Sequence, residues 1–140
     1  MRLFGHPVHP MLVHFPIALW TIGSLADALT LGGVGGARPI AWLAVGAGDA
    51  VALATMTAGL LDYADLDDQI LPVAQRHMAL MGLAWLLYAA AFVWRSHGLA
   101  PGTGPIIGPA VCGFAGFGAL IAGAWQGGQL VYRFGAGVAR

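Results

Sequence analysis

The sequence contains no lysine, no glutamate and one cysteine, and only 9% of its 140 residues are charged. A soluble domain carries about 25% charged residues, so this composition excludes an ordinary water-soluble fold. The formal net charge of zero gives no indication of nucleic-acid binding. Cys112 has no second cysteine to pair with, and the absence of a Cys-x-x-Cys-His motif excludes covalent haem attachment of the c type.

Most of the sequence consists of long apolar stretches. Four of them, residues 11–31, 39–61, 73–94 and 106–131, reach the length of about 20 residues that a helix needs to cross a bilayer. The connections between them are short, which makes neighbouring helices antiparallel. We therefore predict a single domain, residues 1–140, with an all-α fold: an integral membrane antiparallel four-helix bundle. We identify no sequence repeat between its two halves.

Four antiparallel helices give the bundle two ends. Face A carries both chain termini and the loop from Asp62 to Pro72; face B carries the other two loops. Basic residues favour the cytoplasmic side of a membrane. They are more numerous on face A, which predicts a multi-pass protein of a bacterial inner membrane with both termini in the cytoplasm: Arg2, Arg76, Arg133 and Arg140 on face A against Arg38 and Arg95 on face B.

Two histidines lie at the same depth below face A. His14 is close to the start of the first stretch and His77 close to the start of the third. Ionisable side chains inside a membrane segment are costly and usually functional. Haem b held by imidazoles from facing helices is a known arrangement in bundles, so this pair predicts the axial ligands of one haem. The alternative is that both are interfacial histidines bonded to Asp62 or to backbone carbonyls.

Further residues would complete such a haem site. Arg76 could pair with a haem propionate. Met81 could fill a gap behind His77. Trp125 and Gln126 could lie against the edge of the haem. Ligation by two imidazoles leaves no open position on the iron, which favours an electron carrier over an enzyme. The leading hypothesis is thus a membrane b-type cytochrome for electron transfer.

A metal site without haem is the second hypothesis. His6 and His9 are close enough in sequence to share an ion, and Asp62 belongs to the same face as His14 and His77. Imidazole and carboxylate ligands suit a divalent transition metal, although no standard ligand spacing is present. Such a protein would bind or transport the metal. The third hypothesis is a membrane scaffold that docks a redox partner and binds nothing itself.

Two acidic residues occur inside the predicted spans. Asp49 lies near the middle of the second stretch and Asp27 lies closer to face B in the first. We expect neither to have a basic partner at its own depth. Interhelical hydrogen bonding is the favoured role for Asp27, whereas Asp49 is equally compatible with a path for protons. The stripe Ala115, Ala119, Gly123 and Gly127 predicts close helix packing, within the chain or in a homodimer.

Four segments of the chain resemble an uncharacterised membrane family, domain of unknown function 2231. They are Gly5–Pro16 (GHPVHPMLVHFP), Thr57–Asp62 (TAGLLD), the pair Arg76-His77, and Gly127–Val138 (GGQLVYRFGAGV). Members of that family are sometimes fused to Rieske iron–sulfur or cytochrome c modules, so the resemblance implies a redox partner of one of these types. Family members often have a histidine where this chain has Phe134, so a site that needs a third histidine would have to recruit His9 or His6.

Overall fold

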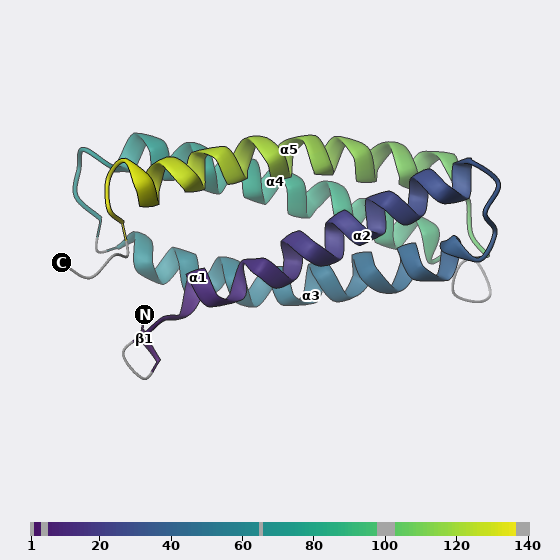
Figure 1. Cartoon of the computed structure of the whole chain (residues 1–140), viewed down its shortest axis with the longest axis horizontal. Coiled ribbons are helices and arrows are strands. Elements are labelled where there is room, and N and C mark those ends of the chain that lie inside the picture. Colours follow the sequence, from purple (N-terminus) through teal and green to yellow (C-terminus); the bar gives the residue numbers. More distant parts are fainter. Residues whose placement is uncertain (1, 4–5, 65, 98–102, 137–140) are drawn as a thin grey trace.

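The protein is a bundle of long helices, as the sequence predicts. The computed structural model describes residues 2–3, 6–64, 66–97 and 103–136 (Figure 1). Two antiparallel strands of two residues each come first, β1 (Arg2–Leu3) and β2 (His6–Pro7). Helices make up nearly all the rest: α1 (Val8–Leu12), α2 (His14–Leu31), α3 (Ala37–Tyr63), α4 (Leu71–Arg95) and α5 (Ile107–Tyr132). The prediction of an all-α, antiparallel four-helix membrane bundle is confirmed.

The first span is divided into α1 and α2 at Val13. Pro16 explains the break, because a proline has no N–H to donate and its ring clashes with the carbonyl four residues earlier, here that of Leu12. The backbone N–H of Val13 still donates to the carbonyl of His9 at 3.1 Å, so the helical path continues through the break. Helices α1 and α2 follow one another as one nearly continuous ribbon from face A into the bundle (Figure 1).

Four spans are long and apolar enough to cross a membrane: Val8–Leu31, Ala37–Tyr63, Leu71–Arg95 and Ile107–Tyr132. Large apolar side chains cover their outer surface, with Leu43 64% exposed and Ile107 72% exposed. A soluble monomer rarely leaves so much contiguous apolar surface in water. Lipid is the solvent that suits this surface, and the chain is therefore a multi-pass integral membrane protein.

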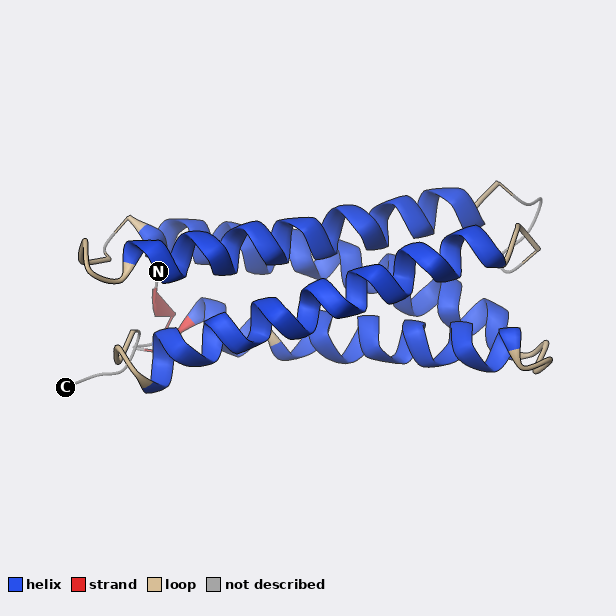
Figure 2. Cartoon of the chain, turned by 90° about the horizontal axis from the view of Figure 1, so that it is seen from above, coloured by secondary structure: helices blue, strands red, loops and turns tan. Residues whose placement is uncertain are grey.

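The helices are arranged as two pairs. Helix α2 packs along α3, and α4 packs along α5, while the contacts between one pair and the other are less extensive (Figures 1 and 2). A small apolar core joins the pairs at mid-height, with Trp20, Val45 and Tyr88 almost fully buried. Small residues surround it, which lets the backbones come close without a large hydrophobic interior.

The two helix pairs are related by an internal two-fold pattern. His9 and His77, Trp20 and Tyr88, and Asp27 and Arg95 are each 68 residues apart, and each pair is in contact across the bundle. Residues that meet their own equivalents lie on the axis that relates two copies. Both halves run in the same direction through the bundle, so this axis is parallel to the membrane normal, as in transporters built from parallel repeats.

Glycines repeat the same pattern. A Cβ atom on Gly48 would meet Trp20 and the Cβ of Leu19, and one on Gly116 would meet Tyr88 and the Cβ of Leu87. Each of these contacts in the first half has its counterpart 68 residues later. Most positions 68 residues apart carry different side chains, so the sequence shows no repeat, but the residues at several of these contact positions are identical in the two halves: His9 and His77, Leu19 and Leu87, Gly48 and Gly116.

Candidate functional site

The two histidines that meet below face A are His9 of α1 and His77 of α4. Their ring centroids are 6.4 Å apart and their planes are nearly perpendicular, at 85°. Both side chains are half-buried. They approach each other from different helix pairs, so the contact lies on the internal two-fold axis and spans the less extensive interface between the pairs.

The first ring is held by α3. His9 Nδ1 lies 2.8 Å from the backbone carbonyl oxygen of Thr55, and because a carbonyl only accepts, Nδ1 is the donor. A Cβ atom on Gly59, one helical turn further along, would lie 2.9 Å from the ring. Glycine at this position is what allows the imidazole to lie flat against the helix.

The second ring is held by α5 in the same way. His77 Nδ1 donates to the backbone carbonyl of Gly123 at 2.8 Å, and a Cβ atom on Gly127 would lie 3.1 Å from the ring. In both halves the histidine and the carbonyl it contacts are 46 residues apart. Each site thus consists of a carbonyl, a glycine one turn later, and an imidazole fixed on top of them.

This arrangement has a feature that metal-binding histidines in other proteins share. A histidine that binds a metal through one ring nitrogen almost always donates the other N–H to a carbonyl, carboxylate or water, which fixes the tautomer and the orientation. With Nδ1 protonated, a neutral ring carries its lone pair on Nε2. No hydrogen bond between described residues uses Nε2 of either histidine.

The predicted partner of His77 lies elsewhere. His14 begins α2 and is exposed on the outside of the bundle, whereas His9, which the sequence suggested only for the alternative metal site, lies beside His77. The two histidines are five residues apart, which places them about 140° apart around the helix axis. Structure therefore brings His77 together with His9 and leaves His14 facing the surroundings.

The remaining predicted haem contacts divide between the inside and the outside of the bundle. Met81 is half-buried against Gly123 and the core, one turn from His77. Gln126 is half-buried on α5, while Arg76 is exposed and Trp125 is 71% exposed.

The alternative metal ligands do not form a cluster in the described part of the chain. Asp62 is half-buried near the end of α3. His6 belongs to β2, and its side chain lies outside the described part of the structure. Among the side chains that are described, no group of three or more His, Cys, Asp or Glu lies close enough together to hold a metal ion.

Asp49 lies in a buried polar cluster at mid-height. Its carboxylate oxygen Oδ1 accepts a hydrogen bond from Trp20 Nε1 at 3.0 Å, and its backbone carbonyl accepts one from Trp85 Nε1 at 3.2 Å. Trp20 stacks on Tyr88 with ring centroids 4.8 Å apart, and the Tyr88 hydroxyl is 2.7 Å from that of Ser24. The partner of the Asp49 side chain is thus the indole of Trp20, from the neighbouring helix α2.

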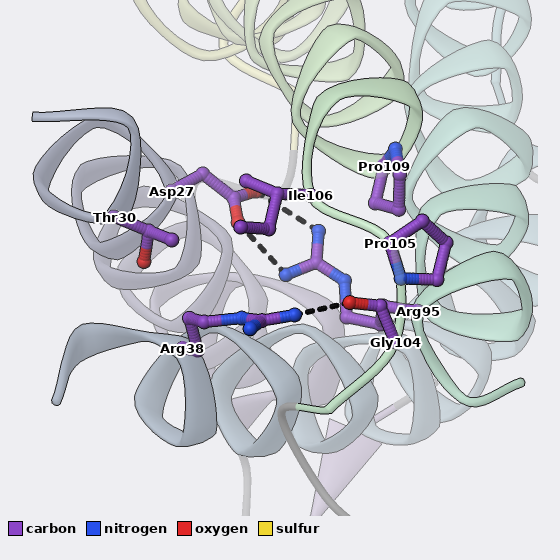
Figure 3. A pocket seen from close by; sticks show the side chains of 8 residues that line it. All are labelled: Asp27, Thr30, Arg38, Arg95, Gly104, Pro105, Ile106 and Pro109. Carbon is purple, nitrogen blue, oxygen red and sulfur yellow. Dashed lines mark hydrogen bonds and ion pairs between the residues drawn. The ribbon is translucent and has the colours of Figure 1, made fainter. Parts of the chain in front are cut away.

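Asp27 has a basic partner, so the contrary expectation was wrong. Arg95 donates through both terminal nitrogens to the two carboxylate oxygens of Asp27, each at 2.9 Å, and both side chains are 7% exposed (Figure 3). The sequence placed Arg95 at the surface of face B because it ends α4. Its long side chain instead turns inward and also donates through Nε to the carbonyl of Ala91.

A small cavity adjoins this ion pair. Its volume is about 20 Å³, enough for roughly one water molecule. Arg38 lies on its other side and donates a hydrogen bond to the carbonyl of Gly104 (Figure 3). Sequence reasoning missed this cluster, although Asp27 and Arg95 were both visible as charges near face B.

Comparison with known proteins gives one match. The model of a family described as a predicted membrane protein, DUF2231, matches residues 5–140. No curated protein and no solved structure gives a significant match.

Proposed function

This chain belongs to the DUF2231 family of predicted membrane proteins, and from its histidine geometry we propose that it is a membrane b-type cytochrome with His9 and His77 as the axial ligands of one haem. The haem would supply one-electron chemistry, and the protein would supply two fixed imidazoles in an apolar surrounding. This proposal keeps the haem expected from the sequence and replaces His14 by His9 as the ligand opposite His77.

The separation of the two rings carries the proposal. Two imidazoles on opposite sides of one metal ion, each bonded at about 2.0 Å, have ring centroids roughly 6.3 Å apart. The observed separation of 6.4 Å agrees with this value for rings whose Nε2 atoms face each other. Both rings also have the Nδ1–H donation to a backbone carbonyl that orients a metal-bound histidine. A haem iron takes four of its ligands from the porphyrin, so two side chains suffice.

The symmetry of the site supports the same conclusion. His9 and His77 are equivalent residues of the two halves, and each would hold the haem from its own helix pair. The macrocycle would enter between the two helix pairs, where the bundle is joined by the fewest contacts and where Met81 can shift, since methionine adapts readily to a changed shape.

We further propose that electrons pass at face A to a Rieske or cytochrome c type partner. The histidine pair lies near this end of the bundle, because His77 is in the second turn of α4 and Gly127 in the last turns of α5. Exposed Arg76 on the same face could hold a propionate or a partner's carboxylate. A bacterial inner membrane remains the proposed setting.

Absorption spectroscopy tests this function. Protein purified in detergent from cells with ample haem should show a sharp Soret band, split α and β bands after dithionite reduction, and near-stoichiometric haem b by pyridine haemochrome. His9→Ala and His77→Ala should each abolish the low-spin spectrum, while the exposed His14→Ala and His97→Ala should leave it unchanged.

Three results would count against the proposal. A featureless spectrum of the haem-supplied wild-type protein would refute haem binding and would make elemental analysis for transition metals the next step. Loss of the spectrum in His14→Ala with retention in His9→Ala would restore the ligand pair expected from the sequence. Equal spectra in all four variants would remove these histidines from the site.

A further inference from the structure

A groove at face B lies outside the histidine site. It is shallow and open, and it is formed by the segment leading into α5, with Arg38 of α3 beside it. Its lining combines one cation with apolar and small residues: Arg38, Thr103, Gly104, Pro105, Ile106, Ile107 and Gly108. It shares Arg38 with the small cavity beside the Asp27–Arg95 pair.

Arg38 is the charge that is left over in this region. Asp27 is fully engaged by Arg95 through two hydrogen bonds. Arg38 donates to the carbonyl of Gly104, and no carboxylate of the described residues lies within ion-pair distance of it. The three charged groups together carry one net positive charge. A guanidinium has five N–H donors, and within the described residues one hydrogen bond of the Arg38 side chain is found, that to Gly104.

The groove lies at the boundary of the membrane, and this position indicates which kind of ligand fits it. Arg38 and Ile107 each lie at the beginning of a membrane-spanning helix, at the same end of the bundle. Ile107 is 72% exposed on the lipid side. A ligand in this groove therefore meets a cation at headgroup level and apolar side chains below it, which is the division of polarity in a phospholipid.

We propose that this groove binds an anionic phospholipid, with its phosphate on Arg38 and one acyl chain along Ile106 and Ile107. Charged oxygens form strong hydrogen bonds with a guanidinium, particularly in a partly desolvated site. A cationic side chain at the membrane surface attracts anionic lipid headgroups. The hydrogen bond to Gly104 holds the Arg38 side chain at the groove and thereby reduces the entropy lost when the lipid binds.

Native mass spectrometry of the delipidated protein in detergent tests the proposal. Wild-type protein titrated with phosphatidylglycerol should bind one molecule about tenfold more tightly than phosphatidylcholine with the same acyl chains. Arg38→Gln keeps an amide that can donate to Gly104 but removes the charge, and it should abolish this preference. Arg38→Lys should retain part of it. Arg133→Gln, which removes an exposed arginine near face A, is the matched control and should behave as wild type.

The same titration can overturn the proposal. Equal affinity for the two lipids, or an unchanged preference in Arg38→Gln with native helicity by circular dichroism, would exclude an anionic lipid on Arg38. Displacement of phosphatidylglycerol by millimolar inorganic phosphate would show that the site recognises free phosphate and makes no use of the acyl chain. If Arg38→Gln unfolds, the preference in wild type and Arg38→Lys decides the question alone.

Discussion

Removing one member of the Asp27–Arg95 pair should destabilise the bundle more than any other single loss of a polar contact. Asp27→Asn keeps the shape of the side chain but leaves the Arg95 guanidinium charged and buried. The pair has two charge-assisted hydrogen bonds of 2.9 Å, and each side chain is 7% exposed, so water screens the interaction very little. Hydrogen bonds to charged groups contribute about 1.5–3 kcal/mol each. Breaking a buried ion pair by removing one partner costs about 3–5 kcal/mol.

We therefore expect Asp27→Asn to lower the free energy of unfolding by about 3 kcal/mol. Denaturant unfolding in detergent, followed by circular dichroism, measures this change. Arg133→Gln is the control, because this exposed side chain lies over the ring of Phe134 and pairs with no carboxylate among the described residues. It should change the free energy by less than about 0.5 kcal/mol.

Exchange of the two charges gives the sharper test. The double variant Asp27→Arg, Arg95→Asp exchanges the positions of the acid and the base, so that opposite charges still face each other. This variant should recover about half of the free energy of unfolding that Asp27→Asn loses. The recovery is incomplete because the Nε bond from Arg95 to Ala91 is lost. The reasoning fails if Asp27→Asn costs less than about 1 kcal/mol, the range of ordinary polar contacts between membrane helices.

Two glycine substitutions test the packing of the axis. Gly48→Ala should lower the free energy of unfolding by about 1–3 kcal/mol, because its Cβ atom would lie 2.7 Å from the Trp20 ring. Gly118→Ala is the control: a Cβ atom there meets no atom within 4 Å, and the substitution should stabilise the protein by about 0.5–1 kcal/mol. Equal effects of the two substitutions in thermal denaturation would contradict the packing. Gly127→Ala should displace the His77 ring, which its Cβ would approach to 3.1 Å, and so alter the haem spectrum of the purified protein, whereas Gly118→Ala should not.

Much of the fold could be predicted because the membrane imposes it. Apolar stretches of sufficient length and short loops leave few alternatives to an antiparallel bundle. The division of the first span at Val13 could not be located with equal ease, since Pro16 shows that a helix is disturbed but not in which direction it turns. The rotation of this first helix about its own axis decides whether His9 or His14 faces His77, because the two residues lie about 140° apart around the helix.

The candidate site could be predicted only in part for the same reason. His77 and the stripe containing Gly123 and Gly127 were identifiable from the sequence, and these residues do lie together. The role of Gly59 was hidden, because a glycine in an apolar helix looks the same whether it faces lipid or a ring. The relation between the halves was hidden too, since Trp20 aligns with Tyr88 and Asp27 with Arg95, pairs that share contacts but not chemistry.

The pairing of Asp27 with Arg95 has a consequence for how the two halves are joined. In an assembly of two identical chains, a residue on the two-fold axis meets its own copy, so an acid there would face an acid and a base would face a base. Opposite charges can meet on such an axis only when the two halves have different sequences. The salt bridge thus distinguishes the first half from the second, and it opposes the pairing of either half with another copy of itself.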